Sequence, residues 1–239
     1  MKLSEILLDN GQDTDFEILQ GLTISGLAND SRKVCPGDMF FALKGEKFDG
    51  LDFALQAEKK GAVVLITYPG GKKKAKKLGI TVPIVEVDNV RKVVSLASKR
   101  WFGKQPKKII AITGTNGKTS VASFLKQIWN NLGIACASIG TLGVDGIEDK
   151  SFEMTTPDPI LLHKYLSELS EKGVDHVVLE ASSHGLSQNR LDHVDITNRA
   201  FTNLSRDHLD YHKCFDEYFL AKAKLFKDVN NACGISIIN

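Results

Sequence analysis

The run I-I-A-I-T-G-T-N-G-K-T-S at residues 109–120 constrains the fold more than any other part of the chain. Its apolar, β-branched start at 109–112 predicts a buried strand of a parallel sheet. Gly114 and Gly117 follow, and the stretch after them, at 121–132, has helical periodicity. A strand, a glycine loop and a helix in this order surround a phosphate chain with backbone N–H groups and a helix N-terminus. The run therefore predicts an α/β fold with a phosphate-binding loop.

The residues after the second glycine indicate a nucleoside triphosphate, with ATP as the expected ligand. Lys118 would reach the outer phosphates, and the hydroxyl of Thr119 would hold Mg²⁺. Only Thr115 and Asn116 separate the two glycines, which is fewer residues than the ordinary phosphate loop has. The alternative is a strand–turn–helix junction without a ligand, and the Lys-Thr pair argues against it.

Size and charge limit the remaining possibilities. The chain has 239 residues, of which 42% are hydrophobic and 25% charged, as expected for a globular protein of roughly two domains. A net charge of +2 gives no sign of a nucleic-acid partner. The lysine-rich run at 72–77 is local, and a solvated helix face is the preferred interpretation.

Cysteine spacing and hydropathy predict a cytoplasmic protein with no membrane partner. The four cysteines show no paired spacing, so we expect reduced thiols and neither a zinc site nor a disulfide framework. No apolar run is long enough to cross a bilayer, and residues 1–5 lack the apolar centre of a signal peptide.

Helices and strands are expected to alternate from residue 1 to residue 104, which predicts a first α/β domain. The expected helices lie at 3–8, 53–60 and 90–101, and the expected strands at 22–27, 39–43, 62–66 and 82–87. The stretch 102–106 contains glycine and proline and is the expected linker.

A second domain is expected over 105–239, where the repeated strand–helix order predicts a doubly wound parallel sheet with ligands at the carboxyl ends of its strands. The expected strands lie at 109–112, 135–139, 174–179, 200–202 and 234–239, and the expected helices at 121–132, 159–172 and 215–226. A parallel strand exposed at a terminus is an unfavourable end for a domain. We therefore expect the sequence to be a fragment or natively truncated.

Three further places carry candidate chemistry. Glu180 follows an apolar strand and, with Thr119, would supply oxygen ligands to Mg²⁺; a capping acid before a turn is the alternative. Asp207 and His208 follow the strand at 200–202 and are metal or phosphate candidates, although Mg²⁺ does not favour imidazole. Lys222 lies on the helix at 215–226, and composition alone favours a surface lysine there.

Taken together, these residues resemble the Mur ligase family. The motif T-G-T-N-G-K-T is shared with folylpolyglutamate synthases and fixes only the superfamily. The segments 30–32, 36–38 and 40–42 are similar to the uridine-binding domain of the MurE and MurF types. Thr155-Thr156-Pro157, residues 180–190 and residues 203–212 look specifically like the MurE type.

The resemblance implies an ATP-dependent amide ligase of peptidoglycan synthesis, and hence of cell-wall biogenesis, cell shape and cell division. It would add the third amino acid, lysine or meso-diaminopimelate, to UDP-N-acetylmuramoyl-L-alanyl-D-glutamate through an acyl phosphate. The family has three domains, and this chain matches the first, over 1–104, and the N-terminal part of the second, over 105–239. The C-terminal domain, which carries the amino-acid selecting motif, is absent, so we expect an incomplete, inactive fragment and a monomer.

The resemblance also implies residue roles. Phosphate contacts would come from Gly114, Thr115, Asn116, Gly117, Lys118, Thr119 and Ser120. Magnesium would be surrounded by Thr119, Glu180, His208 and a carbamylated Lys222. The UDP-muramoyl dipeptide would be held by Thr155, Thr156, Ser182, Gln188 and Arg190, and its uracil end by Asn29, Ser31, Glu46, Lys47 and Phe48. The catalytic residues would be Lys118, Lys222 and His208. Met154 departs from the family, which often has asparagine there, so one amide contact would be lost.

The carbamate that the resemblance implies is physically reasonable. A partly buried lysine near cations has a lowered pKa, so its neutral amine can take up CO₂ and become an anion that binds Mg²⁺. Two alternatives to the MurE-type assignment stay open at this stage. One is a ligase resembling folylpolyglutamate synthase, which the uridine-type domain disfavours, and the other is a non-catalytic module that binds the UDP-substrate and the nucleotide.

Overall fold

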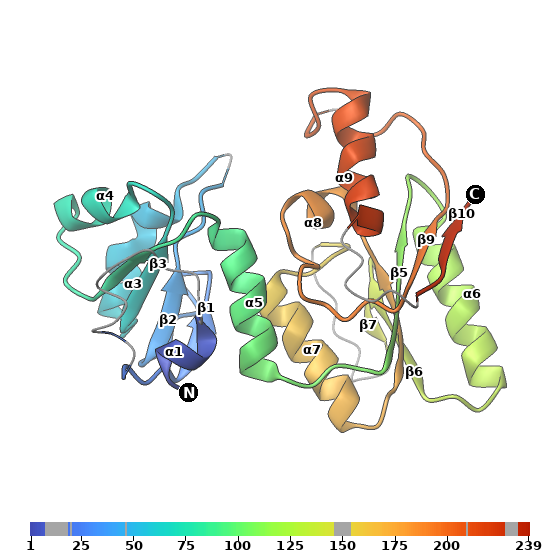
Figure 1. Ribbon diagram of the computed structural model, residues 1–239, viewed down its shortest axis with the longest axis horizontal. Helices are drawn as coiled ribbons and strands as arrows, with labels where there is room; N and C mark the ends of the chain where they lie inside the picture. The colour runs from blue at the N-terminus through green and yellow to red at the C-terminus, as the bar shows by residue number, and fades with distance from the viewer. Residues whose placement is uncertain (8–18, 20, 46, 146–153, 209, 228–233) are drawn as a thin grey trace. The chain divides into compact units, whose positions relative to one another are not determined.

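The computed structural model describes residues 1–7, 19, 21–45, 47–145, 154–208, 210–227 and 234–239 (Figure 1). The chain divides into two compact units, Met1–Trp101 and Phe102–Asn239. The boundary expected from the sequence, between 104 and 105, lies a few residues further along the chain. No helix in the described ranges is both long enough and apolar enough to span a bilayer.

The first unit is an α/β layer built on a four-stranded parallel sheet of order β1-β2-β3-β4. Its strands are β1 (Gly26–Ala28), β2 (Asp38–Phe41), β3 (Val64–Thr67) and β4 (Ile84–Glu86). Its helices are α1 (Leu3–Ile6), η1 (Gly50–Phe53), α3 (Ala54–Lys59), α4 (Gly71–Lys77) and α5 (Val90–Phe102). The strand expected over 22–27 was wrong at its start, because Thr23 forms only an isolated antiparallel bridge with Lys2.

The core of this unit explains why these segments are regular. Every residue of β2 and β3 is buried, as expected for strands covered on both faces. The lysine-rich run forms α4, a helix that buries Gly71 and Ala75 against the sheet side. Ala75 belongs to the same apolar cluster as Phe40 and Leu65, so the helix is anchored by small residues between its lysines.

The second unit contains a six-stranded sheet of order β10-β9-β5-β8-β6-β7. Its strands are β5 (Lys108–Thr113), β6 (Cys136–Gly140), β7 (Gly143–Asp145), β8 (His176–Glu180), β9 (Asn198–Phe201) and β10 (Ser236–Ile238). Its helices are α6 (Lys118–Asn131), α7 (Pro159–Glu171), α8 (Ser183–Ser187) and α9 (Phe215–Lys227). All pairings are parallel except that of β6 with β7. The predicted α/β class with a parallel sheet is confirmed.

Alternate residues of β5 serve the two faces of this sheet. Ile109 and Ala111 belong to the apolar cluster that includes α7, whereas Ile112 packs in the cluster with Ala122 and Trp129 of α6. Figure 1 shows α6 on one side of the sheet and α7 on the other. The period of two along β5 thus produces a sheet covered by helices on both sides.

The strands β9, β5, β8 and β6 lie side by side in the sheet in that order and run parallel, so their carboxyl ends are next to one another. The loops that follow them therefore share one edge of the sheet, where ligands of open α/β sheets bind. Two elements near this edge were not predicted, namely β7 and the short helix α8.

Candidate functional site

The loop after β5 has the backbone shape of a phosphate loop. Gly114 and Gly117 have φ angles of 143° and 84°, which side-chain-bearing residues rarely adopt. A Cβ on Gly114 would also lie 1.9 Å from the Thr202 hydroxyl oxygen and 3.1 Å from the Asn203 nitrogen, so a larger residue would displace the segment that follows β9. Gly117 is the N-cap of α6, which leaves the first amides of a long helix at the loop.

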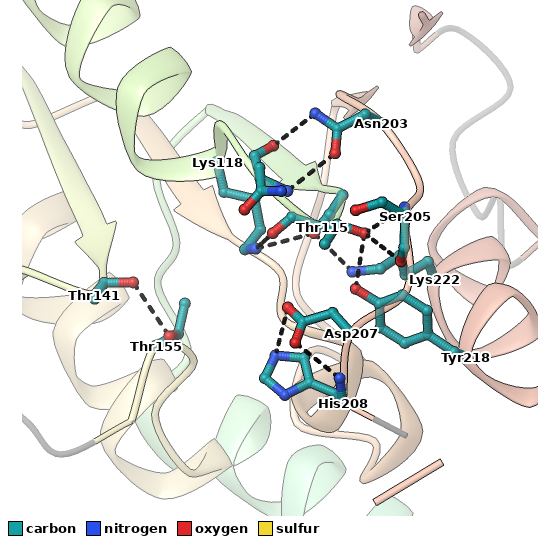
Figure 2. A network of polar contacts seen from close by, with 12 residues as sticks. Thr115, Lys118, Thr141, Thr155, Asn203, Ser205, Asp207, His208, Tyr218 and Lys222 are labelled. Atoms are coloured by element: carbon teal, nitrogen blue, oxygen red, sulfur yellow. Dashed lines mark hydrogen bonds and ion pairs between the residues drawn. The ribbon is translucent and has the colours of Figure 1, made fainter. Parts of the chain in front are cut away.

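Hydrogen bonds tie the loop to the end of β9 (Figure 2). The Asn203 side chain accepts the Asn116 N–H at 3.0 Å and donates to the Asn116 carbonyl at 3.1 Å. The Thr202 hydroxyl donates to the same carbonyl at 2.6 Å, and the Thr115 N–H donates to the Asn203 carbonyl at 2.9 Å. The loop is therefore held in shape by its neighbouring strand.

Lys118 begins α6 and turns its amine back over the loop. Nζ donates to the carbonyls of Gly114 and Thr115, each at 2.9 Å. Burial lowers the pKa of Lys118, and the carboxylates of Glu180 and Asp207 oppose that shift. The side chain thus lies within the loop that would hold an anion.

Glu180 ends β8 and is the centre of the polar contacts beside the loop. Its side chain is 2% exposed, and its Oε2 accepts hydrogen bonds from the hydroxyls of Thr119 at 2.9 Å and Thr141 at 3.1 Å. Its Oε1 accepts the Thr141 N–H at 3.1 Å. A Cβ on Gly140 would lie 2.2 Å from Oε1, so glycine at that position makes room for the carboxylate.

A second network begins at Thr141, whose hydroxyl lies 3.2 Å from that of Thr155. The Thr156 hydroxyl donates to the Glu180 carbonyl at 2.8 Å and lies 2.9 Å from the Ser182 hydroxyl. Ser182 in turn caps α8 by accepting the Gly185 N–H.

Arg190 joins the same network from the turn after α8. Nη1 donates to the Thr156 carbonyl at 2.6 Å, and Nη2 donates to Gln188 Oε1 at 2.7 Å. Gln188 donates to the Tyr211 hydroxyl at 3.1 Å. The Met154 sulfur accepts a contact from Arg190 Nη1 at 3.0 Å. All five residues expected at the dipeptide therefore lie in one connected group.

The loop after β9 gathers aromatic and imidazole rings. His208 has a φ of 51° and lies 3.6 Å from the Asp207 carboxylate through Nε2. The His184 ring lies 5.0 Å from the His208 ring and 3.9 Å from the Tyr211 ring. Burial lowers the pKa of His184 and of His212, and the neighbouring imidazoles add to the shift. These two rings are therefore held in their neutral form near pH 7.

Lys222 on α9 is the most unusual group of the site, because it is a lysine only 1% exposed. Its amine donates to the Gly114 carbonyl at 2.7 Å and lies 4.5 Å from the centre of the Tyr218 ring. Burial, with the nearby charge of Lys118, lowers the pKa of Lys222 to about 7, and Asp207 opposes the shift. The interpretation as a surface lysine, which composition alone favoured, is wrong because α9 packs this face against the loop.

The residues expected around magnesium are only partly brought together. The hydroxyl of Thr119 and the carboxylate of Glu180 meet directly, and these two oxygen donors suit Mg²⁺. His208 contacts Asp207, and Lys222 contacts the Gly114 carbonyl. In the ranges that the structure describes, no group of three or more His, Cys, Asp or Glu side chains is arranged to hold a metal ion.

The residues expected at the uracil end lie in the first unit. Ser31 is buried and donates to Gln56 Oε1 at 2.8 Å. Phe48 is 71% exposed and lies 6.4 Å from the Phe53 ring. Asn29 and Lys47 lie in the same unit, at the end of β1 and in the loop after β2, whereas Glu46 lies outside the described residues.

Sequence reasoning missed two members of the site, Thr141 and Tyr218. Thr141 follows β6 as Glu180 follows β8, so its place at a strand end was a usable signal. Tyr218 precedes Lys222 by one helical turn on α9 and therefore shares its face.

Comparison with known proteins agrees with this architecture. Residues 112–239 match the model of the Mur ligase middle domain, and residues 23–101 match the model described as the Mur ligase family, catalytic domain. Among solved structures, one described as UDP-N-acetylmuramoyl-L-alanyl-D-glutamate–2,6-diaminopimelate ligase aligns with a TM-score of 0.82 and 30% identity. The alignment covers 100% of this chain and 47% of that one.

Curated relatives carry the same name. The protein from Chelativorans sp. (strain BNC1) is 52% identical, over 86% of this chain and 42% of the relative. The protein from Bradyrhizobium diazoefficiens is 45% identical, over 100% of this chain and 48% of the relative. The chain thus spans about half the length of the curated relatives that it matches. On the family models and these identities, the chain belongs to the Mur ligase family.

Proposed function

We propose that this chain forms the substrate-binding and nucleotide-binding part of a MurE-type ligase, which adds the third amino acid to UDP-N-acetylmuramoyl-L-alanyl-D-glutamate. One observation carries the proposal: Glu180 connects the two networks of the site. Its carboxylate bonds Thr119 beside the phosphate loop, and its carbonyl accepts from Thr156 in the group expected at the dipeptide. A triphosphate and the carboxylate that takes up its phosphoryl group would therefore meet across one residue.

The proposed division of labour follows the two units. The first unit, Met1–Trp101, would bind the uridine end through Asn29, Ser31, Glu46, Lys47 and Phe48. The second unit, Phe102–Asn239, would be the N-terminal part of the ATP-binding domain. The relatives are about twice as long as this chain, and their additional length would include the C-terminal domain. The incoming amino acid would be 2,6-diaminopimelate, as in the names of the relatives. We place the protein in the cytoplasm as a monomer.

The chemistry would proceed in two displacements. The D-glutamyl side-chain carboxylate attacks the γ-phosphorus of ATP, so that an oxygen–phosphorus bond forms and the bond to ADP breaks. The amine of the amino acid then attacks the acyl carbon, loses a proton and expels phosphate. The loop amides and the Lys118 ammonium would hold the transferred phosphoryl group and neutralise its charge. Bound Mg²⁺ at Thr119 and Glu180 would supply further charge neutralisation.

Lys222 would act as a carbamate. With its pKa lowered to about 7, its amine is neutral in a substantial fraction of molecules near neutral pH, whereas an ordinary lysine is almost wholly protonated. The neutral nitrogen would add to CO₂ and release a proton, which leaves an anion on α9. His208 would stand beside it as a ligand candidate. The site would then hold a negative group where a metal ion requires one.

Nucleotide binding by the chain is the direct test of the proposal. Calorimetry with Mg²⁺ and a non-hydrolysable ATP analogue should show one site, and Lys118→Ala should lose at least about tenfold in affinity because its amine would contact the phosphates. Lys107→Ala is the matched control, since Lys107 is exposed and pairs only on the surface with Asp175. Unchanged affinity in Lys118→Ala would remove the phosphate-loop assignment.

A second candidate function is a binding module without catalysis. It is favoured by the fraction of the relatives that this chain spans, 42% and 48% for the two described above. An assay of phosphate release with UDP-muramoyl dipeptide and diaminopimelate separates the two. The chain would be compared with a version extended to the length of the relatives. If only the extended protein turns over substrate, the 239-residue chain by itself is a binding module without catalytic activity.

A further inference from the structure

Tyr218 is the buried centre between the phosphate loop and α9. Its side chain is 0% exposed, although it carries a hydroxyl, and it lies one turn before Lys222 on the same helix. Figure 2 shows its hydroxyl directed at Thr115 and its ring lying beside the Lys222 amine. A buried tyrosine hydroxyl needs a partner, and here that partner belongs to the phosphate loop.

The Tyr218 hydroxyl is tied directly to the phosphate loop. Thr115 Oγ1 lies 3.0 Å from the Tyr218 hydroxyl, accepts the Ser205 N–H at 3.0 Å and lies 3.2 Å from the Ser205 carbonyl. Either hydroxyl can be the donor in the Tyr218–Thr115 hydrogen bond. Removing the Tyr218 hydroxyl would break this bond between α9 and the loop.

The ring of Tyr218 lies beside Lys222. The Lys222 amine lies 4.5 Å from the ring centre, and it donates to the same Gly114 carbonyl that accepts from Lys118. The ring also lies 5.3 Å from the His212 ring. One side chain thus contacts the loop, the lysine of α9 and the loop after β9.

We infer that Tyr218 is a positioning residue that clamps the phosphate loop, through its hydroxyl and Thr115, in the shape that accepts a triphosphate. The inference rests on the nucleotide-binding role proposed above. Tyr218 touches no substrate atom itself. Its hydroxyl holds the Thr115 side chain, and its ring packs against the Lys222 amine, which in turn donates to the Gly114 carbonyl. Gly114 and Thr115 are thus both kept in place.

The test uses the whole 239-residue chain with Mg²⁺ and a non-hydrolysable ATP analogue. Tyr218→Phe removes only the hydroxyl and keeps the ring beside Lys222. Thr115→Val removes the hydroxyl that Tyr218 contacts. Each should weaken nucleotide binding by about fivefold, the loss typical of one hydrogen bond, and the double variant should be no weaker than the weaker single variant. Tyr165→Phe on α7, another largely buried tyrosine, is the control and should bind as the wild type does.

A second measurement needs no nucleotide. In amide NMR spectra, Tyr218→Phe should shift the signals of Gly114, Thr115 and Gly117, whereas Tyr165→Phe should leave them unchanged. Unshifted loop amides, or losses in binding that add in the double variant, would overturn the clamp. If the wild-type chain binds no nucleotide, the function proposed above fails, and the amide spectra still decide whether the clamp exists.

Discussion

Lys222 holds its amine where an ammonium ion is poorly stabilised. The nitrogen has the Gly114 carbonyl and the Tyr218 ring as partners, and the charge of Lys118 is nearby. Removal from water without a carboxylate partner disfavours the charged form, which is why the pKa falls to about 7. Because the pKa of Lys222 differs between the folded and the unfolded chain, the free energy of unfolding must depend on pH.

The sign of that dependence follows from proton binding. Between pH 7 and 10.5, the unfolded chain holds a proton on Lys222 that the folded chain lacks, so the free energy of unfolding should rise with pH across this window. The slope from this group is at most about 1.4 kcal/mol per pH unit. Urea unfolding of Lys222→Met in CO₂-free buffer should show a smaller slope than the wild type. Lys164→Met on exposed α7 surface should keep the wild-type slope, and an unchanged slope in Lys222→Met would contradict the burial argument.

Gly140 shows how a small residue can determine the place of a charged one. A methyl group there would lie 2.2 Å from Glu180 Oε1, and the carboxylate is buried among Thr119 and Thr141. Gly140→Ala should therefore lower the free energy of unfolding by about 1–3 kcal/mol, the usual cost of overpacking, and weaken nucleotide binding. Gly21→Ala is the control, because a Cβ at Gly21 meets nothing within 4 Å. Equal melting of both variants would show that Glu180 can move away freely.

The sequence predicted which residues lie at the strand ends, but it did not predict which side chains they contact. Glu180 and the phosphate loop each follow an apolar run, so their common edge could be derived from the parallel topology. The link through Thr141 could not, because it depends on which strand lies beside β8. Likewise, the burial of Lys222 depends on how α9 packs against the phosphate loop, and composition alone favoured an exposed lysine.

At the scale of elements, segments with clear periodicity were predicted, whereas two short elements beside the site, α8 and β7, were missed. The helix predicted over 159–172 is α7, and the strand predicted over 109–112 is β5. α8 was missed because it has a single turn stabilised by the Ser182 cap and by burial of Leu186. β7 was missed because an antiparallel strand of three residues has too little pattern to be distinguished from a loop.

α7 gives a test of local stabilisation. Its N-cap Asp158 accepts the N–H groups of Ile160 and Leu161 at 3.0 and 3.3 Å, and Pro159 occupies the first turn. Asp158→Ala should lower the free energy of unfolding by about 1 kcal/mol, measured by urea denaturation. Asp175→Ala, which removes only an exposed pair with Lys107, should change it by about 0.5 kcal/mol or less. Equal losses would mean that the cap adds nothing beyond a surface charge.

At the scale of the whole molecule, the sheet order of the second unit determines which groups meet. β9, β5, β8 and β6 are consecutive neighbours, and their carboxyl ends supply Asn203, the phosphate loop, Glu180 and Thr141 in that spatial order. Chain order differs, since β6 precedes β8 and β9. The site is thus a product of the crossover connections, which bring together segments distant in the sequence.

This arrangement predicts where a bound nucleotide protects the backbone. At a free ligand concentration of about 100 Kd, binding stabilises the folded state by about 2.7 kcal/mol. Hydrogen exchange should slow most in the segments at the carboxyl ends of the strands, where the nucleotide would bind. We expect the strongest slowing in peptides that contain 114–120 and 201–207, because the Asn116–Asn203 bonds couple these segments. Asn203→Ala should keep the slowing at 114–120 but reduce it at 201–207. Slowing that spares 114–120 in the wild type would place the nucleotide elsewhere.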